Sequence, residues 1–376
     1  MARIVILGSA YPLRGGGLAT FNERLARAFM DHGHEVSIYT FSLQYPAILF
    51  PGKSQYSSGP PPSELDIKVR VNSINPVNWL KTGHELKRLK PDLLVVRYWL
   101  PFMAPCLGTI SAITKRNGHT RVVAIADNII PHEKRPGDKC LTKYFLKRVH
   151  GFVTMSDKVS QHLKEFSISD DRIRHCPHPL YDNFGDVVNQ EEARSVLNIH
   201  RKGKLVLFFG FIRDYKGLDL LLKAFAHPKM RSLQVSLVVA GEFYTREEPY
   251  LKLAQSLGVA DRIIWRTDFI PDEEVRYYFS AADLVAQPYK SATQSGVTQV
   301  AYHFEKPMLV TNVGGLPEMV SHGRAGYVVQ PDPEAIASAM VDFFQQDKSI
   351  LMKNTLKEEK KRFSWDRLVE SLLAPS

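Results

Sequence analysis

The stretch KLVLFFGFIRDYKGLDLLLKAF, residues 204–225, carries the arrangement that decides the fold. A short apolar run, typical of a buried strand, ends at a glycine, and a polar loop then leads into an amphipathic helix pattern. The same order recurs downstream in SLQVSLVVAG with PYLKLAQSLG, and in RIIWRTDF with EEVRYYFSAADL. Strands that alternate with helices predict a parallel sheet with helical crossovers. We therefore expect the second half of the chain to form a doubly wound α/β domain.

The first half of the chain follows the same scheme. Its expected strands are RIVILGSA, EVSIYTF, DLLVVRYW, RVVAIADN and GFVTMS, and a helix is expected from about Leu18 to His32. A polar, turn-rich stretch separates the halves, so we place a hinge near residues 178–200. Open α/β sheets bind ligands beyond the carboxyl ends of their strands, so we expect a cleft at this hinge. The Pro-, Gly- and Ser-rich stretch from about Gln44 to Ser63 is expected to be a lid or a disordered loop.

Composition narrows the class of protein. The 376 residues are 44% hydrophobic and 23% charged, as expected of a soluble globular chain with two domains. No run of about 18 apolar residues predicts a membrane span, and the N-terminus is typical of a first core strand. The cysteines are few, odd in number and far apart, which favours a reducing, cytoplasmic compartment without a disulfide framework or a zinc site. They are Cys106, Cys140 and Cys176.

Charge points to an anionic partner. Lys and Arg number 49 and Asp and Glu 39, a formal net charge of +10. A basic chain of this kind suits a nucleotide diphosphate, phospholipid headgroups or nucleic acid. We expect no nucleic-acid partner, because no recognition motif accompanies the charge.

A glycine loop follows the first expected strand. Gly15, Gly16 and Gly17 precede a helix, so backbone amides and the helix dipole could meet an anion there. The alternative is a flexible turn. The spacing is not that of a dinucleotide-binding or P-loop motif.

Two cations lie in the loop after the strand KLVLFFG. Arg213 and Lys216 could hold a diphosphate and stabilise the charge of a leaving nucleotide, or they could be solvated surface charges. Further on, the sequence SGVT, residues 295–298, begins a helix whose amides could contact an anion. Its Ser295 could instead be only an N-cap.

These motifs, together with VVAGEF, DFIPDEEVRYYFSAADLVAQPY and EKPMLVTNVGGLPEMVSHGRAGYVVQP, resemble the retaining GT-B glycosyltransferases of family GT4. The resemblance covers nearly the whole chain and is strongest over residues 204–345. It implies two Rossmann-like domains that face each other across a cleft. We expect an acceptor-binding domain over residues 1–180, a nucleotide-sugar-binding domain over 181–360, and a C-terminal helix over 361–376 that packs back toward the first domain.

The resemblance also implies roles for particular residues. Arg213 and Lys216 would bind the donor phosphates, and Gly16 and Gly17 would close over the diphosphate and sugar. Phe269, Ile270 and the following proline would cradle the nucleotide base. The start of the 295 helix would add four residues to the donor site, namely Ser295, Gly296, Val297 and Thr298.

The chain departs from the family pattern at two places. The family's pair of glutamates is absent from ATQSGVTQV, where Val300 stands near the second position, so the identity of the donor sugar stays open. Where the family has a histidine after the fifth strand of the first domain, this chain has Asp127, with His132 five residues later. Either residue could orient the sugar or the acceptor, and His132 could equally cap a helix.

The implied reaction is front-face transfer with retention of anomeric configuration, in which the acceptor proton passes to the departing phosphate. Such a reaction needs no enzyme nucleophile, so positioning and electrostatic stabilisation carry the catalysis. We expect UDP- or GDP-sugar as the donor and no metal cofactor, because Arg213, Lys216 and helix N-termini would replace a divalent ion. The alternatives are a nucleotide-sugar epimerase of the same fold and a non-catalytic sugar-nucleotide-binding protein.

Two basic groups lie in the expected acceptor domain. One is a stripe of Lys139, Lys143 and Lys147 at helical spacing, and the other contains Lys81, Lys87, Arg88 and Lys90. With the aromatic, apolar segment 98–102, they favour a peripheral enzyme on the inner face of the cell membrane that glycosylates a lipid-linked or polysaccharide precursor of the cell envelope. Ordinary solvated helix faces are the alternative.

Overall fold

The computed structural model describes residues 1–14, 17–46, 54–57, 59–131, 135–200, 203–292 and 295–375. The chain divides into two compact units. Unit 1 contains Met1–Pro179 and Ser364–Ser376, and unit 2 contains Leu180–Phe363. The boundaries expected from the sequence, 180/181 and 360/361, lie close to these. The division at Pro179 and Leu180 lies within the stretch 178–200 where the hinge was expected, and helix α6 (Gln190–Val196) in that stretch belongs to unit 2.

Unit 1 is built on a seven-stranded parallel sheet in the order β3-β2-β1-β4-β5-β6-β7. The central strands are buried along most of their length, as expected for a sheet covered on both faces. The strands are β1 (Arg3–Leu7), β2 (Glu35–Leu43), β3 (Asp66–Asn72), β4 (Leu93–Tyr98), β5 (Arg121–Ala126), β6 (Gly151–Thr154) and β7 (Ile173–His175).

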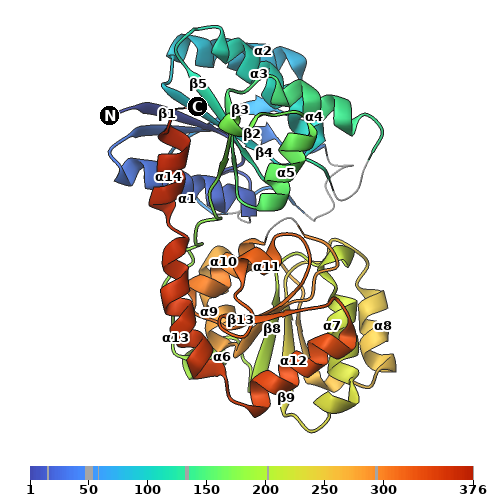
Figure 1. The fold of residues 1–376 in the computed structure, drawn as a ribbon. Helices are drawn as coiled ribbons and strands as arrows, with labels where there is room; N and C mark the ends of the chain where they lie inside the picture. The colour runs from blue at the N-terminus through green and yellow to red at the C-terminus, as the bar shows by residue number, and fades with distance from the viewer. Residues whose placement is uncertain are drawn as a thin grey trace. The chain divides into compact units, whose positions relative to one another are not determined.

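Helices cover both faces of this sheet, with α2, α3 and α4 on one side and α1 and α14 on the other (Figure 1). The α-helices are α1 (Gly17–Asp31), α2 (Pro76–Leu89), α3 (Ala104–Lys115), α4 (Asp138–Leu146), α5 (Asp157–Glu165) and α14 (Trp365–Leu373), and the 3-10 helices are η2 (Pro101–Met103) and η3 (Asp170–Arg172). Helix α1 buries Phe21, Leu25 and Phe29 at four-residue spacing.

The C-terminal helix α14 packs on α1. The rings of Trp365 and Phe21 have centroids 5.0 Å apart, and His32 Nε2 lies 2.8 Å from Asp366 Oδ1. Ser364 caps α14 by accepting a hydrogen bond from the amide of Asp366. The last helix of the chain therefore completes unit 1.

Unit 2 repeats the design with a six-stranded parallel sheet in the order β10-β9-β8-β11-β12-β13. Its strands are β8 (Lys204–Phe209), β9 (Val235–Ala240), β10 (Ile263–Arg266), β11 (Leu284–Gln287), β12 (Met308–Thr311) and β13 (Gly326–Val329). Its remaining α-helices are α7 (Leu218–Ala226), α8 (Glu248–Ser256), α9 (Asp272–Ala281), α10 (Gly296–His303), α11 (Leu316–Met319), α12 (Pro333–Gln345) and α13 (Ser349–Glu359). The 3-10 helices are η4 (Asp214–Lys216), η5 (Pro228–Met230), η6 (Ala260–Arg262) and η7 (Lys360–Arg362).

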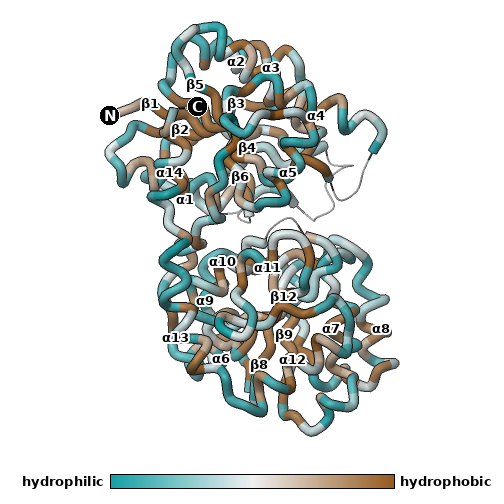
Figure 2. The backbone as a smooth tube through the Cα atoms, in the orientation of Figure 1, coloured by the Kyte–Doolittle hydropathy of each residue, from teal (hydrophilic) through white to brown (hydrophobic). Residues whose placement is uncertain are grey.

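Hydrophobic residues concentrate in the strands, while the outer turns of the helices are hydrophilic (Figure 2). In unit 2 one core cluster joins alternate residues of β8 and β9 to the inner faces of α7, α8 and α12. This pattern follows the expected alternation of strands and helices. Among the helices of the described ranges, none is long and apolar enough to cross a membrane.

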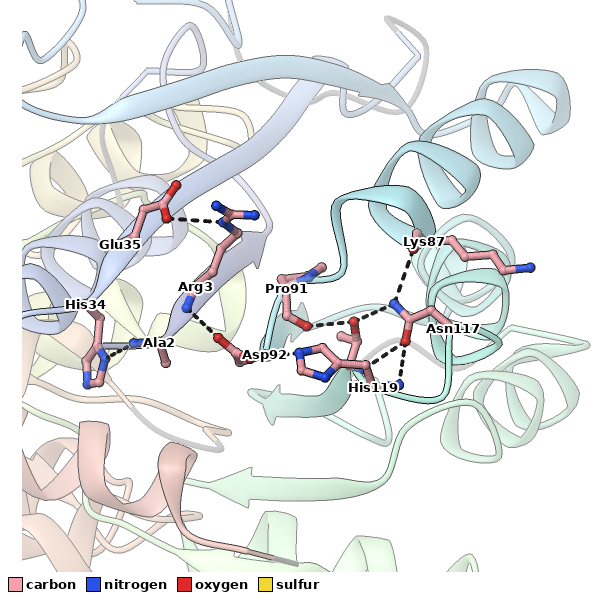
Figure 3. Close-up of polar contacts among 10 residues, drawn as sticks. Ala2, Arg3, His34, Glu35, Lys87, Pro91, Asp92, Asn117 and His119 are labelled. Atoms are coloured by element: carbon pink, nitrogen blue, oxygen red, sulfur yellow. Dashed lines mark hydrogen bonds and ion pairs between the residues drawn. The ribbon is translucent and has the colours of Figure 1, made fainter.

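The strand order reverses beside the first strand of each unit. β1 lies between β2 and β4, and β8 lies between β9 and β11, so each sheet has a switch point at its carboxyl edge. In unit 1 the opposite, amino edge is held together by local polar contacts (Figure 3). The amide of Arg3 donates to Asp92 Oδ2 at 2.7 Å, and His119 Nε2 lies 2.8 Å from Asp92 Oδ1. The carboxyl edge is therefore where a ligand is expected.

Candidate functional site

The loop between β8 and α7 is the most distinctive feature of unit 2. This loop turns at two positions where the backbone adopts a positive φ, and both positions are glycines. Gly210 has φ +94°, and Gly217 has φ +69° at the start of α7, where a Cβ would lie 1.9 Å from the carbonyl oxygen of Pro288. This close approach fixes the short helix η4 against the end of β11. Arg213 and Lys216 are therefore held at the switch point of the sheet.

Lys216 is a partly buried cation at the carboxyl edge of this sheet. Burial, and then the positive charge of Arg213, lower the pKa of Lys216 to about 8. Across the described part of the chain, neither residue forms a salt bridge. Their charges instead face aromatic rings, with Lys216 Nζ 5.6 Å from the ring centre of Tyr289 and Arg213 5.0 Å from that of Tyr244. Two uncompensated cations at a ligand edge favour an anionic ligand.

Helix α10 begins beside these cations. A Cβ placed on Gly210 would lie 3.1 Å from Lys216 Nζ and 3.7 Å from Val297 Cγ2, so the β8 glycine, the lysine and the first turn of α10 are neighbours. Within the described residues the Ser295 side chain makes no capping hydrogen bond, and its hydroxyl lies 3.3 Å from that of Tyr289. Ser295 occupies the N-cap position of α10, as the alternative expected, but its side chain does not accept a hydrogen bond from an amide of the first turn in the described structure.

The other residues of this turn have structural contacts. Thr298 is fully buried and donates to Gln287 Oε1 at 3.0 Å. A Cβ on Gly296 would lie 2.8 Å from the ring of Tyr181, so the ring packs directly against the start of α10. We infer that this turn can offer backbone amides rather than side-chain hydroxyls to an anion.

The expected base-binding segment lies apart from this group. Phe269 and Ile270 are half-buried in the connection from β10 to α9, and Pro271 is the N-cap of α9. Strand β10 is the edge strand, separated from β8 by β9. The segment thus belongs to the same carboxyl edge as the cations, two strands away.

In unit 1 the expected residues are only partly described. Gly17 is the exposed first residue of α1, while Gly15, Gly16 and His132 lie outside the described residues, as does part of the 44–63 stretch. Asp127 directly follows β5 and is mostly buried. The structure pairs it with Arg97 of β4, whose Nη2 donates to Asp127 Oδ1 at 2.6 Å and whose Nε donates to Oδ2.

Arg97 is a residue that the sequence patterns missed. It is 3% exposed, and its guanidinium carbon lies 3.8 Å from the ring centre of Phe21. The signal was a single arginine inside the apolar run DLLVVRYW. His178 is also buried, and burial lowers its pKa to about 3, so the ring is neutral beside Phe21. Its Nδ1 lies 2.7 Å from the carbonyl oxygen of Pro179.

The aromatic, apolar segment 98–102 begins at Tyr98, the last residue of β4, and its residues Trp99, Leu100 and Phe102 are half-buried. Tyr98 is fully buried, stacks on Phe145 with ring centres 4.2 Å apart, and places its hydroxyl 3.0 Å from that of Thr142. Among the exposed aliphatic residues of this unit, Val77 and Leu80 of α2 are 58% and 48% exposed.

Comparison with solved structures defines the class of fold. The structure superposes with a TM-score of 0.75 on sucrose-phosphate synthase from Thermosynechococcus elongatus, at 18% identity and over 99% of this chain and 98% of that one. It superposes with a TM-score of 0.73 on Anabaena HepE, at 16% identity and over 99% of each chain. Two doubly wound domains of this kind are the GT-B fold of glycosyltransferases, as the sequence predicted.

Family comparison extends the result. Residues 15–181 match the family described as Glycosyltransferase Family 4, and residues 203–346 match that described as Glycosyl transferases group 1. The chain belongs to these glycosyltransferases.

Relatives of known name agree with the family. A D-inositol 3-phosphate glycosyltransferase from Streptomyces avermitilis is 29% identical over 66% of this chain, and one from Acidothermus cellulolyticus is 25% identical over 95% of it. The first match spans about half of the relative (51%) and the second 84%.

Proposed function

We propose that the protein transfers a hexosyl group from a UDP- or GDP-sugar to an acceptor hydroxyl, with retention of anomeric configuration. The observation that carries the proposal is the pair Arg213 and Lys216, two cations without acidic partners among the described residues, next to the start of α10. A diphosphate supplies the charge that this site lacks. The Anabaena protein, which shares the fold, was solved with UDP and with UDP-glucose, which supports a nucleotide-sugar donor.

The residues of unit 2 suit a reaction in which a phosphate leaves. When the bond from the sugar to the diphosphate breaks, negative charge grows on the leaving oxygen, and a partly desolvated lysine and arginine stabilise that charge strongly. The amides of α10 add to this stabilisation. The acceptor proton then passes to the departing phosphate, so no enzyme nucleophile is required, and Gly17 and Asp127 orient the sugar or the acceptor.

We further propose that the reaction needs no metal cofactor, because Arg213, Lys216 and helix amides take the place of a divalent ion on the diphosphate. Activity is then expected to persist in EDTA and to show no gain with Mg²⁺ or Mn²⁺. Loss of transfer in EDTA, with recovery on adding one of these ions, would contradict this part of the proposal.

The acceptor is proposed to be a lipid-linked or saccharide precursor of the cell envelope, reached from the cytoplasmic face of the membrane. Support comes from exposed basic residues of unit 1: Lys139 and Lys143 on α4 and Lys147 at its C-cap. Helix α2 adds exposed Val77 and Leu80 beside exposed Lys81. Basic and aliphatic side chains together suit an anionic lipid surface. The relatives named as D-inositol 3-phosphate glycosyltransferases make that phosphorylated polyol a soluble acceptor to test.

The test is incubation with a panel of UDP-, GDP- and ADP-sugars, following both nucleotide release and the identity of the sugar. Slow release of nucleotide by transfer to water supports a glycosyltransferase. Interconversion of the sugar would instead identify an epimerase, and binding without any reaction a non-catalytic binding protein. The Lys216→Ala variant is expected to lose the release, whereas Lys223→Ala, which removes an exposed lysine from α7, is expected to keep it.

A further inference from the structure

The Arg97–Asp127 ion pair lies at the carboxyl edge of the unit 1 sheet. Strands β4 and β5 pair in register, with Tyr98 opposite Ala126, and Asp127 directly follows β5. The amide of Asp127 donates to the carbonyl of Tyr98 at 2.9 Å, which fixes the backbone of the aspartate. β4 also borders β1 at the switch point, where open sheets of this type bind their ligands.

The pair is bidentate and almost fully enclosed. Two guanidinium nitrogens of Arg97 donate to the two carboxylate oxygens of Asp127, and the guanidinium carbon lies 3.8 Å from the centre of the Phe21 ring. The third nitrogen, Nη1, is buried without a hydrogen-bond partner in the described structure. This geometry leaves the carboxylate one orientation.

Stability does not account for such a pair. Desolvating two charges is costly, and apolar residues of similar volume often serve as well in a core. The neighbouring strand residues, Val95, Val96 and Ala124, are buried and apolar. An unpaired buried nitrogen adds a further cost. A costly polar arrangement at the ligand edge of the sheet favours a functional role.

We propose that Arg97 is a positioning residue, which holds Asp127 as an oriented carboxylate that accepts hydrogen bonds from hydroxyl groups of a saccharide. An ionised carboxylate only accepts hydrogen bonds, and a guanidinium fork fixes the direction in which its oxygens point. The hydroxyls belong to the donor sugar or to the acceptor. This inference rests on the proposed function and assigns a residue outside the diphosphate site.

The central test uses the double variant Arg97→Met with Asp127→Leu, which removes the whole pair and leaves no buried charge unpaired. Single variants Asp127→Asn and Arg97→Lys accompany it. Calorimetry gives the affinity for UDP and for the UDP-, GDP- or ADP-glucose that the parent hydrolyses. Kinetics gives hydrolysis of that donor and transfer to D-inositol 3-phosphate, and thermal unfolding reports the fold.

We expect the double variant to unfold near the parental temperature, to bind the free nucleotide as the parent does, and to lose transfer by roughly 10- to 100-fold, the equivalent of hydrogen bonds to a charged group. The transfer rate of Arg97→Lys should lie between those of the parent and the double variant, because lysine keeps the positive charge but cannot form the bidentate hydrogen bonds. If the double variant binds the sugar nucleotide more weakly than the parent but binds free UDP equally well, the hydroxyls belong to the donor sugar. If donor binding and donor hydrolysis are unchanged and only transfer is lost, the hydroxyls belong to the acceptor.

A matched control breaks another largely buried ion pair. Arg194 Nη2 lies 2.9 Å from Asp283 Oδ2 in unit 2, where Asp283 precedes β11 at the amino edge of the sheet. Arg194→Met should lower the unfolding temperature without changing the ratio of sugar-nucleotide to nucleotide affinity. If the folded double variant hydrolyses the donor and transfers the sugar as the parent does, the role inferred for Arg97 and Asp127 is wrong, while the proposed function still stands. A parent that neither binds nor hydrolyses any nucleotide sugar would instead refute the proposed function, and the inference with it.

Discussion

At the scale of single residues, the pKa of Lys216 predicts how nucleotide binding depends on pH. Its pKa lies near 8 in the unliganded protein, because burial and Arg213 both disfavour its charge. A bound diphosphate favours the charged form. Below pH 8 the lysine is already protonated and binding takes up no proton, whereas above pH 8 binding must protonate it first. Nucleotide affinity is therefore expected to fall as pH rises through about 8.

Calorimetry with UDP or GDP at pH 7 and pH 9.5 checks this dependence. Lys216→Ala should weaken binding at pH 7 by about 1.5–3 kcal/mol, the range for hydrogen bonds to charged groups, and should lose the decline between the two pH values. Lys216→Arg should also lose the decline, because arginine stays protonated. A parental protein that binds equally well at both pH values would show that Lys216 does not contact the phosphates. Lys223→Ala is the control for loss of one positive charge.

At the scale of elements, the β8–α7 connection depends on one glycine. Gly217 combines φ +69° with a Cβ position 1.9 Å from the Pro288 carbonyl oxygen, so Gly217→Ala must displace the loop that carries Arg213 and Lys216. We expect loss of nucleotide binding together with a fall in unfolding free energy of more than the ~1–2 kcal/mol that a left-handed alanine costs by itself.

Gly258 supplies the matched control for that variant. It has nearly the same conformation, φ +67°, but no heavy atom of the described structure lies within 4 Å of its Cβ position. Gly258→Ala should therefore cost only the backbone strain and leave nucleotide binding intact. Equal effects of the two substitutions on unfolding and binding would show that the contact with Pro288 does not hold the site. Denaturant unfolding and calorimetry measure both quantities.

The elements also show what local sequence patterns can and cannot provide. The run 204–225 predicted a strand, a cationic loop and a helix, because the glycines, charges and apolar spacing that specify them are all local. Arg97 and Asp127 are 30 residues apart and meet only because β4 and β5 are neighbours in the sheet. No local pattern encodes that pairing. Likewise, Tyr98 is buried by Phe145 of α4, a contact between distant segments.

At the scale of the whole molecule, the net charge of +10 is expected to act at a lipid surface. Lys139, Lys143 and Lys147 are exposed at successive turns of α4 and its C-cap in unit 1. Each basic residue near an anionic membrane contributes about 1 kcal/mol, and the attraction decays within a Debye length of about 8 Å at physiological ionic strength. Three lysines therefore predict reversible attachment that salt weakens.

Sedimentation with vesicles that contain anionic lipid, at low and high salt, tests this attachment. The triple variant of Lys139, Lys143 and Lys147 to Glu should stay in solution where the parent pellets at low salt. A second triple variant reverses Lys223, Lys252 and Lys357, which are exposed on unit 2, and loses the same net charge. It should still pellet if position on unit 1, rather than total charge, brings the protein to the membrane. Equal behaviour of the two triple variants would assign the attraction to net charge alone, and a parent that never pellets would favour a soluble acceptor.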